Sequence, residues 1–505
     1  MNKSIQAISN QLTKKTVGRM AVVDIGSNTV RLVVYDTPNR LPVPIFNEKS
    51  SCQLGHGLAI TGRLNPAGVE CAMNSLARFI SLGASMGVER MDFLATAAVR
   101  DASDGFEFVR RVKLALGVQI EIPTGIEEAQ LAALGLLSGI PDADGILVDM
   151  GGGSVDLVEL NQGDFGRAVS LPVGHLRLPK AAQGDLKNAR DIVNKNLTLL
   201  TWLADGKGRD LFVIGGAWRA LGRVIIEQTK YPLHVIDGYT LKNTDAFRMC
   251  RLIENLSSNT LLGIPGITKA RAQALPFSAM VLVAMLERTM ARKIIFSGFS
   301  MREGHLLKML PPSISSQDPL LSGCATMAER TGRFSITGQE IFDWISPLFP
   351  PSRDQESRLR LAASILSDIG WSEHPDYRAE HSFLRTLRLP FSGLSHADRV
   401  FISLAIFVRY NGDPRNKLVK SVQLLMTPHD SGHANIVGLA LRLAHTISGS
   451  APGILQITRL VMDRKRVHLQ LPNDTAGERD LFLGDAVRRR FKTLAQALGR
   501  ASVIE

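Results

Sequence analysis

Two short segments of the sequence combine aspartate, glycine and hydroxyl side chains in the pattern that a phosphate site requires. Val22–Val34 contains Asp24-Ile-Gly-Ser-Asn-Thr, and Leu147–Val158 contains Asp149-Met-Gly-Gly-Gly-Ser. In each segment an apolar run ends in aspartate, a turn follows, and a second apolar run begins. Glycine lets the backbone approach an anion closely and can expose consecutive N–H donors. We therefore predict two phosphate-binding turns.

The polar side chains of these turns suggest how the chemistry is divided. Hydroxyl and amide groups are donors to phosphate oxygens, whereas aspartates at strand ends suit Mg²⁺, which takes one or two carboxylates together with water and phosphate oxygens. Asp24 and Asp149 are therefore the first metal candidates. The predicted phosphate-binding residues of the turns are Ser27, Asn28, Gly151, Gly152, Gly153 and Ser154.

Two adjacent glutamates follow the segment Pro123-Thr124-Gly125-Ile126. Thr124 and Glu127 match a helix capping box, which gives Glu127 a structural role. Glu128 has no such role, and a carboxylate at a helix start near a metal–phosphate site could orient and deprotonate water. The alternative is a solvated first-turn glutamate, which the helix dipole favours.

Arg100 follows a predicted buried strand, Met91–Leu94. A guanidinium at that position could clamp phosphate with two parallel hydrogen bonds. A salt bridge to Asp101 or Asp104 is the alternative, and the sequence by itself leaves both open.

Short β-branched runs alternate with helical patterns from residue 19 to about 315. The strands that carry the turns are predicted at Met20–Asp24, Val30–Tyr35, Ile146–Asp149 and Val155–Leu160, and helices at Ile126–Leu137 and Trp218–Gln228. This alternation is typical of an α/β architecture. Because the strand–turn–strand unit occurs twice, we predict a duplicated fold whose halves face each other across a cleft.

The pattern changes after the stretch Pro311-Pro312-Ser-Ile-Ser-Ser, which we interpret as a linker. The following residues are helical, and the C-terminal segment contains predicted strands at Leu455–Val461 and Val467–Leu471. The predicted domains are lobe I at 18–137, lobe II at 138–313, a helical domain at 320–446 and a small α+β lobe at 447–505.

Composition limits the partners. The chain has 59 Lys+Arg and 47 Asp+Glu, a formal net charge of +12, which attracts polyanions. Two basic runs, Arg464-Lys465-Arg466 and Arg488-Arg489-Arg490 with Lys492, could follow a long polyanion, although a solvated helix face explains the second run equally. We find no nucleic-acid recognition motif. The four scattered cysteines, together with the polar segment Met1–Arg19 and the shortness of the apolar runs, predict a cytoplasmic protein that does not span a membrane.

Together, these motifs resemble the exopolyphosphatase / guanosine pentaphosphate phosphohydrolase (Ppx/GppA) family. The resemblance rests on the two turns, Thr96–Arg100, Gly125-x-Glu-Glu-Ala, Pro172-Val-Gly174 and Ser297–Gly304. It implies duplicated ribonuclease H-like lobes related to actin, heat-shock chaperones and sugar kinases, followed by a degenerate HD-like helical domain and an α+β lobe.

The resemblance also assigns roles. Glu128 matches the catalytic base, Asp149 a metal- or water-orienting carboxylate, and Asp156 a second metal position where many members have glutamate. Asp24 is a weaker metal candidate. The positions that match phosphate binding are Ser27, Asn28, Arg100, Gly151, Gly152, Gly153 and Ser154.

Two departures from the family pattern bear on function. This chain has Ala217-Trp218-Arg219 where family members usually have Gly/Ser-Gly-Thr. The segment corresponds to the adenosine motif of related kinases. In the helical domain, Ser367-Asp368 replaces the expected His-Asp pair, so we do not expect a second metal site there.

The resemblance implies an exopolyphosphatase, which removes terminal phosphate from inorganic polyphosphate with Mg²⁺ or Mn²⁺, and with K⁺ as a candidate further ion. Two alternatives remain open. One is a guanosine pentaphosphate (pppGpp) 5′-phosphatase, and the other is a non-catalytic regulator that binds polyphosphate or guanosine penta- and tetraphosphate. The family also implies a homodimer.

Overall fold

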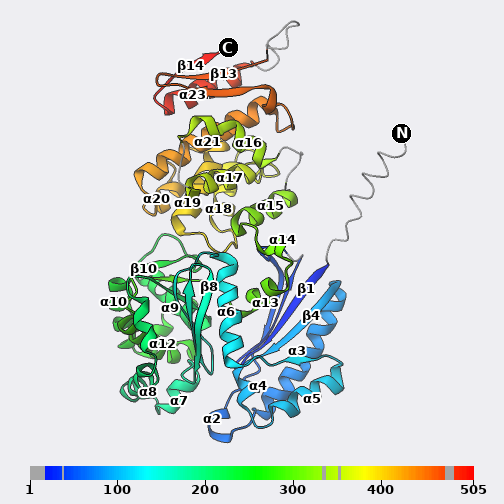
Figure 1. Cartoon of the computed structure of the whole chain (residues 1–505), viewed down its shortest axis with the longest axis vertical. Coiled ribbons are helices and arrows are strands. Elements are labelled where there is room, and N and C mark those ends of the chain that lie inside the picture. Colours follow the sequence, from blue (N-terminus) through cyan, green and yellow to red (C-terminus); the bar gives the residue numbers. More distant parts are fainter. Residues whose placement is uncertain (1–17, 37–38, 332–336, 351–353, 473–482) are drawn as a thin grey trace, which may run out of the picture. The chain divides into compact units, whose positions relative to one another are not determined.

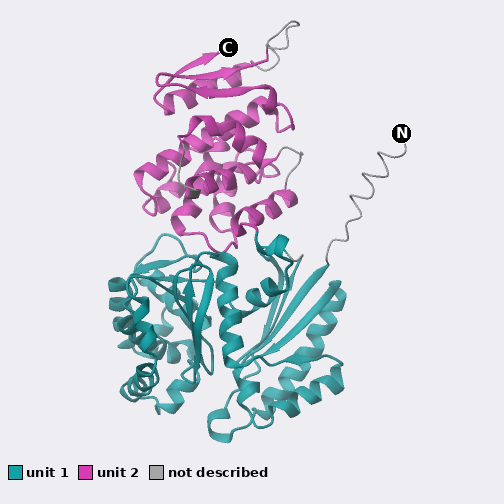
Figure 2. Ribbon diagram, in the orientation of Figure 1, with its two compact units in different colours: residues 1–316 teal, residues 317–505 magenta. Residues whose placement is uncertain are grey.

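The computed structural model describes residues 18–36, 39–331, 337–350, 354–472 and 483–505. The chain divides into two compact units, the first ending at Ser316 and the second beginning at Gln317 (Figures 1 and 2). This division falls at the end of the predicted linker. Most of the polar segment Met1–Arg19, from which we predicted a cytoplasmic protein, lies outside the described residues. Within the described residues, no helix combines the length and the apolar character needed to cross a bilayer.

The first lobe of the first unit is a mixed sheet with helices on it (Figure 1). Its strands are β1 (Arg19–Ile25), β2 (Val30–Tyr35), β3 (Pro44–Ser50), β4 (Val88–Ala95) and β5 (Ile120–Glu121), and its helices are α2 (Leu58–Thr61), α3 (Pro66–Ser85), α4 (Ala97–Asp101) and α5 (Gly105–Leu116). The strand order is β3-β2-β1-β4-β5. The β1–β2 hairpin is antiparallel, and β4 adds to β1 in parallel.

The second lobe contains the other sheet and most of the helices of this unit. Its strands are β6 (Gly145–Met150), β7 (Val155–Asn161), β8 (Asp164–Leu171), β9 (Asp210–Ile214), β10 (Thr240–Lys242) and β11 (Lys293–Phe296). The helices from here to the end of the unit are α6 (Gly125–Gly139), α7 (Arg177–Ala181), α8 (Leu186–Thr198), α9 (Gly216–Gln228), α10 (Asn243–Glu254), α11 (Ser258–Leu262), α12 (Lys269–Thr289), α13 (Met301–Met309) and α14 (Pro312–Ser315), with a 3₁₀ turn η1 at Thr201–Gly206.

The two sheets have the same topology. Read from the outer strand of its hairpin, the second sheet runs β8-β7-β6-β9-β11, which repeats β3-β2-β1-β4-β5 and adds β10 at the edge. The β6–β7 hairpin is antiparallel, and β9 adds to β6 in parallel, as β4 adds to β1. The predicted duplicated α/β fold is therefore confirmed.

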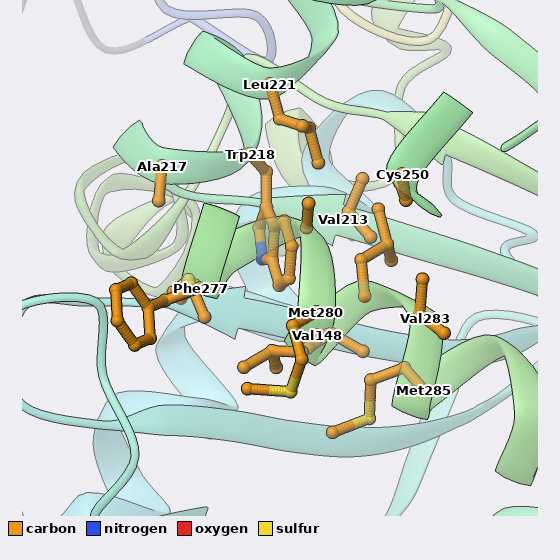
Figure 3. Close-up of a cluster of buried hydrophobic side chains, with 14 of the residues drawn as sticks. Val148, Val213, Ala217, Trp218, Leu221, Cys250, Phe277, Met280, Val283 and Met285 are labelled. Carbon is orange, nitrogen blue, oxygen red and sulfur yellow. The ribbon is translucent and has the colours of Figure 1, made fainter. Parts of the chain in front are cut away.

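The second lobe has the larger apolar core. Trp218 of α9 is fully buried among side chains from β6, β9 and α12, including Val148, Val213 and Met280 (Figure 3). A tryptophan buries a large apolar area, so this contact fixes the start of α9 against the sheet.

Helix α6 lies between the two sheets. Its alanine and leucine residues, including Ala129 and Leu136, pack on the second sheet. Leu131, on the opposite side, packs with Val22 and Leu94 of the first sheet. Although the predicted boundary assigned these residues to lobe I, the helix contributes to the cores of both lobes.

Helices α6 and α13 cross at two glycines. A Cβ added to Gly135 would lie 2.0 Å from Ser300 O, and one added to Gly304 would lie 1.8 Å from Leu131 O. No real Cβ contact is this short, so any side chain would push the helices apart. The crossing thus brings the first turn of α6 and the first turn of α13 into a fixed relation.

The second unit is a helical domain followed by a small sheet (Figure 2). Its elements are α15 (Pro319–Thr331), α16 (Gly338–Ile345), α17 (Asp354–Ile365), α18 (Arg378–Leu387), α19 (His396–Arg409), α20 (Lys417–Gln423), α21 (Pro428–Ser448), β12 (Arg459–Met462), β13 (Arg466–Gln470), α23 (Asp485–Ala497) and β14 (Ala501–Ile504), with 3₁₀ turns η2 (Ser346–Leu348) and η3 (Leu455–Ile457). The strand predicted at Leu455–Val461 is wrong in its first three residues, which form a 3₁₀ turn.

We expect Gly304→Ala to lower the free energy of unfolding by about 1–3 kcal/mol, because the added methyl group overpacks the α6–α13 crossing. Differential scanning calorimetry measures this change. Gly432→Ala is the control, since Gly432 lies in the exposed start of α21 and its added Cβ meets no atom within 4 Å. That variant should be neutral or slightly stabilised, because alanine favours helix more than glycine does. Equal effects of the two substitutions would contradict the packing argument.

Candidate functional site

The two predicted phosphate turns have the same backbone geometry. In the first lobe, Gly26 N donates to Thr29 O at 2.9 Å, and in the second lobe, Gly151 N donates to Ser154 O at 3.0 Å. Each bond closes the tip of an antiparallel hairpin, β1–β2 or β6–β7. The sequence repeat therefore corresponds to a structural repeat at this level too.

The turns meet at one pocket of about 150 Å³. A Cβ added to Gly152 would lie 3.1 Å from Ser27 Cβ, so the second turn approaches the first closely. Four of the seven predicted phosphate-binding residues line this pocket, namely Ser27, Asn28, Gly152 and Gly153, whereas Gly151, Ser154 and Arg100 do not. The other lining residues are Gln53, Gly55, His56, Leu58, Ala59, Ala97, Ala98, Asp101, Leu176, Arg177 and Lys180.

The backbone of the second turn is arranged to favour an anion. Its carbonyl groups are occupied, because Gly153 O accepts from Gly174 N at 3.2 Å and Gly151 O accepts from the His175 ring at 2.7 Å. Over the residues that the structure describes, the N–H groups of Gly152 and Gly153 donate to no acceptor. Successive unused N–H groups form a concave anion site. This also explains the Pro172-Val-Gly174 motif, since a Cβ at Gly174 would lie 2.5 Å from Ser154 N.

Glu128 lies in the first turn of α6 and is held by Arg100. Arg100 Nη1 donates to Glu128 Oε2 at 2.7 Å and to Pro123 O at 3.0 Å, and the Glu128 side chain is 14% exposed. Burial raises the pKa of the Glu128 carboxyl, Arg100 opposes the rise, and Asp24 adds to it. A carboxylate with a raised pKa is a stronger base, which suits proton abstraction from water.

The neighbouring Glu127 has a different role. Thr124 N and Thr124 Oγ1 donate to Glu127 Oε2 at 2.8 and 2.9 Å, and Glu127 N donates back to Thr124 Oγ1. The capping box predicted from the sequence is thus confirmed. The Glu127 carboxylate is used by the hydrogen bonds from Thr124. Of the two glutamates, Glu128 is therefore the candidate for proton transfer.

Arg100 forms salt bridges in the structure, and one of them is the contact with Asp101 that the sequence left open. Besides Glu128, its Nε lies 3.6 Å from Asp101 Oδ1, whereas Asp104 pairs with Arg63. Asp101 in turn accepts from Arg177 Nη2 of the second lobe at 2.9 Å. The chain of contacts links the two lobes at the pocket.

Asp149 and Asp156 lie opposite each other on the β6–β7 ladder. Side chains of directly opposed residues share one face of a sheet, so the two carboxyl groups are neighbours. Burial, reinforced by Glu128, raises the pKa of Asp149 to about 7. Burial and the same glutamate also raise the pKa of Asp156, which accepts a hydrogen bond from Ser170 Oγ at 2.5 Å.

These two carboxylates fit a hydrated divalent cation. Within the described residues, no hydrogen bond or ion pair reaches the Asp149 carboxylate, and no three Asp, Glu, His or Cys side chains form a ready-made metal cage. Mg²⁺ is usually held by only one or two carboxylates, with water and phosphate oxygens completing its shell. A cation here would also relieve the repulsion between Asp149, Asp156 and Glu128.

Asp24, the weaker metal candidate, already has a cationic partner. Its Oδ2 accepts from Arg302 Nη1 of α13 at 3.0 Å, and Arg302 is 8% exposed. Next to this pair, Tyr35 OH donates to Glu303 Oε1 at 3.0 Å. The two contacts join the first sheet to α13, and they give Asp24 a structural role beside any part it has in binding metal.

Four residues of the region were not singled out from the sequence: Ser170, Arg177, Arg219 and Arg302. Arg302 belongs to the quoted stretch Ser297–Gly304, but its partner Asp24 lies 278 residues earlier. Ser170 and Arg177 carry no local signal. Arg219 stood in a segment noted only as a departure from the family.

The comparison with protein families agrees with this geometry. Residues 33–313 match the profile of the Ppx/GppA phosphatase family. The chain belongs to this family. In addition, residues 335–504 match the C-terminal domain of exopolyphosphatases. As a Ppx/GppA phosphatase the chain is a hydrolase of phosphate bonds.

Curated relatives cover much of the chain at low identity. Exopolyphosphatase 1 of Mycobacterium leprae is 25% identical over 311 residues, which are 58% of this chain and 89% of that protein. Retrograde regulation protein 2 of Saccharomyces cerevisiae is 26% identical over 446 residues, or 78% of this chain and 72% of that one. The second match extends beyond the length of the first unit.

Solved structures share the fold of the first unit. An exopolyphosphatase from Cytophaga hutchinsonii aligns with a TM-score of 0.53 and 24% identity, covering 58% of this chain and 97% of that one. A PPX-GPPA enzyme of Aquifex aeolicus aligns with a TM-score of 0.50 and 25% identity, covering 57% and 98%. The two-lobed arrangement is thus that of Ppx/GppA structures.

In the helical domain, an arginine pairs with the aspartate of the altered His-Asp position. Arg409 Nη2 donates to Asp368 Oδ1 at 3.1 Å. Ser367, at the histidine position, forms a hydrogen bond with His445 Nε2 at 2.8 Å, and His445 Nδ1 bonds to Ser450 Oγ at 2.7 Å. The guanidinium thus supplies positive charge at the aspartate of the altered pair.

We expect Asp149→Asn to stabilise the metal-free protein at pH values above about 4. An acid whose pKa rises from 3.8 to about 7 on folding makes the folded state less stable as the pH rises between those values. The variant should therefore exceed the parent in unfolding free energy by a margin that grows from about pH 4 and levels off above pH 7. At about 1.4 kcal/mol per pKa unit, the margin is at most about 4 kcal/mol. Urea unfolding at several pH values measures it.

Glu127→Gln is the control for this prediction. Hydrogen bonds from Thr124 lower the pKa of Glu127, so its ionised form stabilises the folded state. Its replacement should therefore lower stability once the pH exceeds the ordinary glutamate pKa. Changes of the same sign in both variants would contradict the assigned environments.

Proposed function

We propose that the chain is an exopolyphosphatase, which hydrolyses the terminal phosphate of inorganic polyphosphate and releases orthophosphate. Membership in the Ppx/GppA phosphatases supports the reaction class, and the curated exopolyphosphatase relatives support the substrate. The observation that carries the proposal is the environment of Glu128. This buried carboxylate of raised pKa is held by Arg100, and its charge raises the pKa values of Asp149 and Asp156 on the hairpin of the second phosphate turn.

The residues of the chain divide the work of hydrolysis. The unused N–H groups of Gly152 and Gly153, with the Ser27 and Asn28 side chains, bind phosphate oxygens. Glu128 accepts a proton from the attacking water as the new phosphorus–oxygen bond forms. The bridging oxygen leaves with the shortened chain and takes its proton from solvent. Phosphoryl transfer needs positioning and charge stabilisation more than covalent catalysis. Hydrogen-bond donors to the phosphate and a base for the water are therefore the kinds of group that the reaction requires.

We further propose that Asp149 and Asp156 hold Mg²⁺ or Mn²⁺. Such an ion supplies positive charge against the phosphate oxygens and offsets the repulsion of the carboxylates. Arg100 and Asp24 remain at the margin of this centre, since both are engaged in ion pairs.

The proposal predicts that Glu128→Gln lowers kcat on long-chain polyphosphate by about 10²–10⁴-fold, because proton abstraction is lost. Phosphate release is measured with Mg²⁺, in the presence and absence of K⁺. Glu127→Gln is the matched control on the same helical turn and should keep most of the activity. No release by the parent protein, or undiminished release by Glu128→Gln, would refute the proposal. A side-by-side kcat/KM comparison with guanosine pentaphosphate then separates the two phosphatase functions.

A group of arginines in the second unit supports a long polyanionic substrate. Arg442 of α21 lies near Arg489 and Arg490 of α23, and burial together with Arg490 lowers the pKa of Arg442 to about 10. In the described part of the chain, none of the three forms an ion pair with a carboxylate. Like charges held together without counter-charge attract an anion.

We expect Arg489→Glu to raise KM for long-chain polyphosphate roughly three- to tenfold at low salt and to leave kcat/KM for tripolyphosphate unchanged. Steady-state kinetics at two salt concentrations measure both. Arg415→Glu is the control, because the exposed Arg415 is already paired with Asp413 at 2.8 Å. Equal loss on long and short substrates would contradict a role in holding the chain.

Location and assembly complete the proposal. We propose a cytoplasmic enzyme, which the four free cysteines support, because unpaired thiols persist in reducing compartments. We also propose a homodimer on the basis of family resemblance, and light scattering of the purified protein tests this.

A further inference from the structure

Arg219 is a guanidinium without a protein partner beside the proposed reaction centre. Arg219 lies in the first turn of α9, and its backbone N–H donates to Gly215 O. Within the described residues, its side chain forms no ion pair or hydrogen bond, and Nη1 is sealed from solvent. A buried donor without an acceptor costs free energy, so such groups in native proteins are generally satisfied by ordered water, an ion or a ligand.

The start of α9 is pressed against Asp149. Gly215 has φ 105°, and an added Cβ would lie 2.7 Å from Asp149 Oδ1. Trp218, next to Arg219, is fully buried in the core of the second lobe (Figure 3). The Ala-Trp-Arg segment thus anchors the helix through Trp218 and brings Arg219 toward the carboxylates of the site.

Within the described residues, the carboxylates near Arg219 form no ion pair with its guanidinium. Burial lowers the pKa of Arg219 to about 10, Arg302 and Arg31 add to this effect, and Asp149 and Glu303 oppose it. Glu303 is already bonded to Tyr35 and to Ser300 N. Asp149 approaches no nitrogen of Arg219 within ion-pair distance in the described structure. An incoming anion would therefore satisfy the unused donors of Arg219.

We propose that Arg219 binds non-bridging oxygens of the phosphoryl group that is hydrolysed, approaching it from the second lobe. This inference rests on the proposed function for the identity of the substrate. The planar guanidinium can donate two parallel hydrogen bonds to phosphate. Arg100, which lies in the first lobe, is committed to Glu128, whereas Arg219 has no protein partner within the described residues and can donate to the substrate. The departure from the family sequence thus creates a phosphate ligand.

Three variants test the contact. Arg219→Ala removes the guanidinium, and Arg219→Lys keeps the charge without the fork. Arg223→Met is the control, since Arg223 is exposed one turn further along the same helix. We expect Arg219→Ala to lower kcat/KM on polyphosphate about 100-fold, with a smaller loss for Arg219→Lys and no loss for Arg223→Met. Added guanidinium should restore Arg219→Ala in a saturable manner, whereas urea should not.

Binding of orthophosphate, measured by calorimetry, separates this inference from the proposed function. We expect the affinity of Arg219→Ala for orthophosphate to fall at least about tenfold, because a charge-assisted hydrogen bond is lost. This fall would support the contact even if the parent protein released no phosphate from polyphosphate. Unchanged phosphate affinity, or a kcat/KM within about twofold of the parent, would overturn the inference. A loss of activity that guanidinium does not restore in the folded variant would likewise overturn it and leave Arg219 a structural role.

Discussion

The proposed reaction centre concentrates negative charge, which would oppose the entry of a negatively charged phosphate. Glu128, Asp149 and Asp156 are buried close together, and repulsion between them adds to the effect of burial in raising the pKa values of both aspartates. Two nearby arginines are already used in ion pairs, Arg100 with Glu128 and Arg302 with Asp24. In the proposed mechanism, positive charge for the substrate therefore comes from a bound cation and from Arg219.

The scaffold maintains this unfavourable cluster through contacts that carry little charge. Helix α6 brings Glu128 to the site because its small residues pack on the second sheet while Leu131 packs on the first. Gly135 and Gly304 let α6 and α13 cross at backbone contact. Since dense apolar packing resists displacement, it can hold carboxylates at distances that their repulsion disfavours.

Much of the fold follows from local patterns. The β1–β2 and β6–β7 hairpins, the capping box at Thr124 and the duplication of the lobes were all predictable, because strand periodicity and turn chemistry depend on neighbouring residues. The error at Leu455–Ile457 has the same origin, since a short apolar run is compatible with either a strand or a 3₁₀ turn. In the helical domain the sequence identified the altered Ser367-Asp368 pair, but Arg409 as its partner lies 41 residues away.

The sequence by itself determined which residue types are present for phosphate chemistry and that they recur in two equivalent turns. Only the tertiary structure decided how they are used. It pairs Asp24 with Arg302 and places Asp149 opposite Asp156 on neighbouring strands. It gives Glu127 a capping role that Glu128 does not share. It also leaves Arg219 without a partner, although the sequence suggested only a missing nucleotide motif. Which side chains form ion pairs, and which are buried, depends on residues far apart in the chain. These long-range contacts set the pKa values of the carboxyl groups and decide which hydrogen-bond donors are left unused.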